Sequence, residues 1–133
     1  MHFLVRILRY VWASPATALG LLFVAMTWAS GGSVCVQTGT VEAHGGLARR
    51  VLRRGLPLLG SGAAITFGHV ILGQDSDCLE DSREHEHVHV RQYERWGPFM
   101  LPLYVTASLI LWLRHRDPYL DNPFEIEAYD RRG

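Results

Sequence analysis

Two histidines four residues apart are the first candidates for chemistry in this chain. His85 and His89 open and close a His-Glu-x-x-His sequence in which Glu86 directly follows the first histidine. On a helix, side chains four residues apart lie on one face with Cβ atoms roughly 6 Å apart, so both imidazoles can bind one metal ion. The Glu86 carboxylate can reach a metal-activated water without binding the ion, as a general base must. The spacing therefore predicts a catalytic zinc site.

A later acidic segment can supply a third ligand. Asn122 and Pro123 are typical of the N-cap and the first position of a helix, so a short helix is expected to follow them. On that helix Glu125 and Glu127 cannot point the same way, so one carboxylate can enter the core while the other stays in water. Acidic residues in a first turn also stabilise a helix by themselves, which is the alternative role for both.

Together these segments resemble a known family of enzymes. His85-Glu86-x-x-His89 followed by Glu125-x-x-Ala-Tyr129 is similar to the glutamate-zincin metallopeptidases, in which a glutamate from a second helix completes the zinc site. The resemblance implies Glu125 as the third zinc ligand, with Glu127 as a possible substitute. It also implies a fourth position open to water, as in catalytic zinc sites. The fifth residue of the second motif is often aspartate in those enzymes and is Tyr129 here.

The wider sequence, from Gly68-His69-Val70 to Phe124-Glu125, also resembles a family of small bacterial membrane proteins. The bacterial inner membrane is therefore the expected location.

The rest of the chain predicts a small α+β fold. Residues 33–44 form two β-prone runs around a Thr-Gly turn, which predicts a hairpin, and residues 63–72 predict one further strand. Between them, residues 47–59 carry two pairs of arginines and are interpreted as a solvated loop, with a membrane-surface stretch as the alternative.

The His-Glu-x-x-His motif is expected on a helix over residues 79–96. His87 would lie about 200° round that helix from the ligands, so it is assigned to solvent or to a neighbour. Gln92 and Tyr93 share roughly the face of His89 and could support it, although Tyr93 fits a packing role equally well. The strand containing His69 could hold an extended peptide by edge pairing, whereas His69 itself is expected to be a core or surface histidine.

An uncharged run predicts an N-terminal membrane anchor. Residues 10–30 contain no charged residue, a length that matches the roughly 20 residues of a spanning helix, and Arg6 and Arg9 precede them. We therefore divide the chain into an anchor at residues 1–31 and a minimal zincin-like domain at residues 32–133. The arginines favour a cytoplasmic N-terminus and a body on the outer side.

A second uncharged run, residues 98–113, is near the lower limit for a spanning helix. His85 and His89 precede this run and Glu125 follows it. A complete crossing would place these three ligands on opposite sides of the bilayer. A shared metal therefore predicts a membrane-associated helix that does not separate them.

Composition narrows the functional classes. Thirteen basic residues balance thirteen acidic ones, so nucleic acid is not an expected partner. The first hypothesis is a membrane-associated zinc hydrolase, a peptidase acting on a peptide or protein near the lipid bilayer. The alternative is a non-catalytic accessory subunit of a larger membrane protein complex that retains the metal site.

Overall fold

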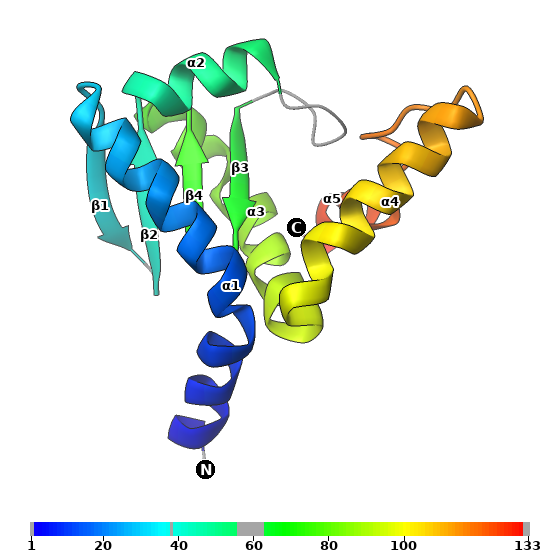
Figure 1. Ribbon diagram of the computed structural model, residues 1–133, viewed down its shortest axis with the longest axis horizontal. Coiled ribbons are helices and arrows are strands. Elements are labelled where there is room, and N and C mark those ends of the chain that lie inside the picture. The colour runs from blue at the N-terminus through cyan, green and yellow to red at the C-terminus, as the bar shows by residue number, and fades with distance from the viewer. Residues whose placement is uncertain (1, 38, 56–62, 132–133) are drawn as a thin grey trace.

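The computed structural model describes residues 2–37, 39–55 and 63–131 and has a mixed sheet between helices (Figure 1). Helix α1 (His2–Ala29) and helix α2 (Gly46–Arg54) lie on one face of the sheet, and helix α3 (Ser76–Trp96) lies on the other. The predicted α+β class is therefore confirmed in outline.

Two hairpins form the four-stranded sheet. Strands β1 (Ser33–Gln37) and β2 (Thr40–His44) pair antiparallel, as do β3 (Ala64–Phe67) and β4 (Val70–Gly73). The hairpins meet through parallel pairing of β2 with β4, which gives the order β1-β2-β4-β3. Strand β3, which packs beside α3, is thus an edge strand.

The first hairpin confirms the prediction for residues 33–44, but the prediction of one strand over residues 63–72 is wrong. The chain reverses at Gly68-His69 and makes two strands. Gly68 has a φ of 61°, and a Cβ there would lie 2.3 Å from Thr17 Oγ1 of α1. A glycine thus permits both the turn and its close approach to the helix, a requirement that β propensity does not reveal.

The loop predicted over residues 47–59 is also corrected, because Gly46–Arg54 is helical. Ala48 and Leu52, four residues apart on α2, are buried, and Ala48 packs in the core of the sheet. The arginines of α2 are exposed. Burial of this narrow apolar stripe stabilises the helix despite its charge. Residues 56–59 of the predicted loop lie outside the described residues.

Strand β4 lies between β2 and β3 in the sheet, and all its residues are buried. Val70 and Leu72 pack with Val24 on the side of α1 and α2, whereas Ile71 packs with Leu79 on the side of α3. Alternate residues of a strand point to opposite faces, so a continuous apolar run is what a doubly covered strand requires.

Helix α1, the predicted anchor, packs along this sheet. Its buried residues recur every three or four positions, and a Cβ on Gly20 would lie only 2.7 Å from the Cβ of Val70. Its other side exposes large apolar residues such as Leu22 and Trp28. By length and composition, His2–Ala29 and the continuous helical run Ser76–Leu113 could each cross a membrane.

The site is carried by α3 and by the chain after it. The helix expected over residues 79–96 is confirmed, although it begins at Ser76, where the Asp75 carboxylate accepts a hydrogen bond from Cys78 N at 2.8 Å. A short 3-10 turn, η1 (Gly97–Phe99), leads into the apolar helix α4 (Met100–Leu113). The chain then reverses, and helix α5 (Pro123–Arg131) returns to α3.

Candidate metal centre

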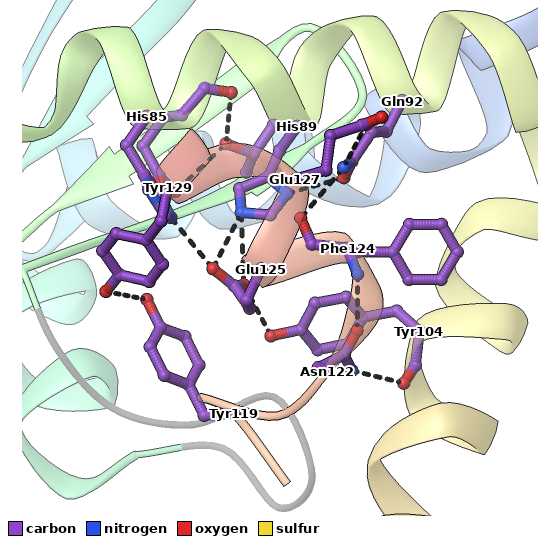
Figure 2. Close-up of polar contacts among 12 residues, drawn as sticks. His85, His89, Gln92, Tyr104, Tyr119, Asn122, Phe124, Glu125, Glu127 and Tyr129 are labelled. Carbon is purple, nitrogen blue, oxygen red and sulfur yellow. Dashed lines mark hydrogen bonds and ion pairs between the residues drawn. The ribbon is translucent and has the colours of Figure 1, made fainter. Parts of the chain in front are cut away.

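The structure brings His85, His89 and Glu125 together between α3 and α5. All three side chains are buried, and one potential ligand atom from each lies within 4.8 Å of the others. Figure 2 shows the Glu125 carboxylate between the two imidazoles. Helix α4 therefore does not separate these residues, because the chain turns back after it.

The distances fit a metal ion. Glu125 Oε1 lies 2.9 Å from His85 Nε2 and 3.1 Å from His89 Nε2. Tetrahedral zinc with bonds of about 2.0–2.1 Å places its ligand atoms about 3.3 Å apart. Glu125 Oε1 and each imidazole nitrogen need to separate by only a few tenths of an ångström, and two imidazoles with a carboxylate are a common donor set for catalytic zinc.

Gln92 fixes the orientation of His89. Its amide nitrogen donates hydrogen bonds to Phe124 O at 3.0 Å and to Glu127 Oε1 at 2.8 Å. Its oxygen therefore faces His89 Nδ1, 2.8 Å away, and accepts a hydrogen bond from it. In the neutral ring, this leaves the lone pair of His89 on Nε2, toward Glu125, as metal binding requires.

The same contacts distinguish the two glutamates. Glu125 enters the histidine cluster, whereas Glu127 contacts Gln92 behind it. Asn122 caps α5 as expected, since its Oδ1 accepts from Phe124 N at 3.0 Å, and the helix then presents Glu125 of its first turn to the histidines.

Tyr104 is a site residue that the sequence did not indicate. Its hydroxyl donates a hydrogen bond to Glu125 Oε2 at 2.7 Å (Figure 2). The available signal was general, since a buried tyrosine hydroxyl needs a polar partner. Tyr104 thus holds Glu125 Oε2, which also lies 3.1 Å from His89 Nε2, while Oε1 faces both histidines.

Glu86 lies buried beside the cluster. Thr66 Oγ1 on the edge strand β3 donates to Glu86 Oε1 at 3.3 Å. Burial raises the pKa of Glu86, while the nearby charges of His89 and His85 act in the opposite direction. A carboxylate with a raised pKa is well suited to accept and return a proton near neutral pH. Thr66, like Tyr104, was missed by the sequence analysis.

A cavity of about 30 Å³ adjoins Glu86, His89 and Glu125. This is about the volume of one water molecule in the liquid. Strand β3 lines one side of it, from Ala64 to Phe67, and Tyr104 and Tyr119 lie on another. The site therefore has room for a small reactant next to Glu86.

The hydrogen bonds also determine the charge of the metal-free cluster. Burial by itself raises the pKa of Glu125, but hydrogen bonds from His85, His89 and Tyr104 and the charge of His89 together lower it to about 2. Burial lowers the pKa of His89, yet Glu125, Glu86 and Gln92 raise it to about 9. His89 must therefore lose a proton when a metal binds.

The other residues that the sequence singled out lie outside the cluster of His85, His89 and Glu125. His69, expected to be a core or surface histidine, is buried in the β3–β4 turn, stacked on Tyr10 at 3.8 Å and paired with Glu94 at 2.8 Å. Tyr93 packs in the core and also lines the cavity beside Glu86, and His87 is half-buried on the other side of α3.

Tyr129, at the position where the resembling enzymes often have aspartate, lies with its ring 4.5 Å from that of His85. Its hydroxyl lies 3.4 Å from that of Tyr119. These two tyrosines flank the histidine cluster in Figure 2.

Comparisons with models of protein families, with curated proteins and with solved structures give no match to this chain. Its chemistry is therefore inferred from its own residues and geometry.

Proposed function

We propose that this protein is a membrane-associated zinc hydrolase, a peptidase in which His85, His89 and Glu125 hold the metal and Glu86 is the general base. The observation that carries the proposal is the position of Glu86, buried beside three convergent ligands and next to a water-sized cavity. A site that binds metal only for stability has no chemical need for a buried carboxylate at this place.

A bound zinc ion would polarise a substrate carbonyl and lower the pKa of water to about 7. The protein's own part is to move a proton and to hold the reactants. Glu86 would accept the proton of the attacking water and return it to the leaving amine, and Thr66 would keep its carboxylate oriented toward the cavity.

A peptide is the substrate class that the sheet edge favours. Among the described residues, β3 pairs only with β4, so its outer edge has backbone groups available for pairing. Thr66 links this strand to Glu86, and Ala64 to Phe67 line the cavity. An extended chain added along β3 would thus lie next to the general base.

The experiment is a peptidase assay on the full chain in detergent with Glu86→Gln beside the wild type. We expect the substitution to lower the rate about 100-fold or more while one zinc per chain is retained, because general-base catalysis contributes at least that much. Glu84→Gln is the matched control, since Glu84 is exposed on the same helix. Equal rates for wild type and Glu86→Gln would contradict the proposal.

A second candidate is a non-catalytic subunit of a larger membrane complex. It is favoured by the apolar residues that α1 and α4 expose, among them Trp28, Ile110 and Trp112. Stoichiometric metal without hydrolysis of a broad set of peptides would support this candidate over the peptidase.

A further inference from the structure

A second cavity, of about 240 Å³, lies between α1 and α3 and is rich in arginine. Arg9 of α1 and Arg91 and Arg95 of α3 line it, together with Glu94 and Glu127. It is far larger than the roughly 30 Å³ that one water occupies, so it can hold a charged group of several atoms.

Positive charge is in excess in this cavity, because three arginines and two glutamates line it. Glu94 is paired with His69 at 2.8 Å and also lies in the field of Arg9 and Arg91, and Glu127 accepts a hydrogen bond from Gln92 at 2.8 Å. Among the described residues, none of the three arginines has a carboxylate within ion-pair distance. Their guanidinium groups can thus donate hydrogen bonds to an anion from outside.

The cavity lies where both apolar segments begin. Trp12 Nε1 of α1 donates a hydrogen bond to Arg95 O at 3.2 Å, and the ring of Trp12 contacts that of Phe99 at 6.1 Å. The uncharged part of α1 and the apolar run through η1 and α4 therefore start side by side, near the base of Figure 1.

Exposed aromatic residues near the start of these two segments are typical of a membrane surface. Trp12, Trp96 and Phe99 are 42%, 41% and 59% exposed, respectively. Tryptophan is enriched at the level of lipid headgroups, and arginines there extend toward the phosphates. The chemistry around the cavity thus matches the interface between the hydrocarbon core and water.

We propose that Arg9, Arg91 and Arg95 form a binding site for the phosphate headgroup of an anionic phospholipid. The planar guanidinium group donates paired hydrogen bonds to phosphate oxygens, which favours arginine in such sites. The inference does not depend on the metal. Since Gln92 lines this cavity and also contacts His89, it places the metal centre one side chain from the membrane surface.

The test measures lipid binding by the full chain in neutral detergent, with phosphatidylglycerol as the probe and native mass spectrometry as the readout. We expect the variant Arg9→Gln/Arg91→Gln/Arg95→Gln to bind this lipid on the order of 100-fold more weakly than the wild type. The matched control is Arg50→Gln/Arg53→Gln/Arg54→Gln on α2, which removes the same charge and should bind as the wild type does. If the triple variant fails to fold, Arg91→Gln alone should weaken binding several-fold.

Two further probes identify the ligand. Phosphatidylcholine should bind at least 10-fold more weakly than phosphatidylglycerol, and inorganic phosphate should not compete at millimolar concentration. The proposal is overturned if the cavity variant binds phosphatidylglycerol like the wild type, or if the α2 control weakens equally. Efficient competition by inorganic phosphate would assign the site to a soluble anion instead.

Discussion

At the scale of single residues, the buried Glu125 carboxylate contacts three side chains. Its Oε1 faces both histidines, and its Oε2 accepts a hydrogen bond from Tyr104 and also lies 3.1 Å from His89 Nε2. Residues that orient a ligand carboxylate in this way usually strengthen metal binding. Tyr104 is therefore expected to act on the metal through Glu125.

Removing only the hydroxyl of this tyrosine tests that role. We predict that Tyr104→Phe lowers zinc affinity about 10- to 100-fold, because Glu125 loses the donor that holds its second oxygen. Competition with a chelator of known affinity measures the change. The control is Tyr10→Phe, which removes a tyrosine hydroxyl that donates to Gly39 O, away from the cluster, and should leave the affinity unaltered. Equal affinities for Tyr104→Phe and the wild type would mean that the hydrogen bond does not support the ligand.

At the scale of elements, the position of α5 decides which glutamate meets the histidines. Asn122 is fully buried, and its amide nitrogen donates to Ser108 Oγ at 2.9 Å and to Tyr104 O at 3.2 Å. Its oxygen caps α5 through Phe124 N. One side chain thus joins α4 to the helix that carries Glu125.

Loss of this link should loosen both helices. We predict that Asn122→Ala lowers the free energy of unfolding by about 2 kcal/mol, because it removes the cap and leaves buried polar groups without a partner. Denaturant unfolding in detergent measures the effect. Asp130→Ala, at an exposed position of α5, should change the stability by less than about 0.5 kcal/mol. A similarly small effect of Asn122→Ala would show that α5 is held by other contacts.

The elements also differ in how far the sequence could predict them. The helix of the histidine motif, the first hairpin and the cap at Asn122 depend on local patterns and were predicted. The turn at Gly68 and helix α2 depend on contacts with α1 and the sheet, which local patterns do not encode. The contacts of Tyr104 and Thr66 join distant segments, so they too required the structure.

At the scale of the whole molecule, α1 is part of the fold as well as a candidate membrane helix. Gly20 lies close against Val70 of the sheet, and Ala13 and Ala16 pack with Tyr93 and Met100. Its opposite face is apolar and exposed. One helix can therefore contact the protein core on one side and lipid on the other.

This double role predicts that substitutions on the two faces of α1 have unequal effects on the stability of the protein. Gly20→Leu should destabilise the protein by about 1–3 kcal/mol, because the new side chain would overlap Val70 in the sheet. Leu22→Ala, at a residue that is 57% exposed, should have little effect on unfolding in detergent. Thermal or denaturant unfolding of both variants measures the difference. Equal stabilities would indicate that α1 is only an anchor.

The most direct test of the account is the metal content of the purified protein, measured by inductively coupled plasma mass spectrometry. Wild type should be compared with His89→Ala, Glu125→Ala and Asp130→Ala, the last being the control because Asp130 is exposed on the helix that carries Glu125. We predict about one zinc per chain in the wild type and in Asp130→Ala, and loss of the metal in the other two variants. Absence of stoichiometric metal from the folded wild type, or retention of it in both His89→Ala and Glu125→Ala, would contradict the shared site.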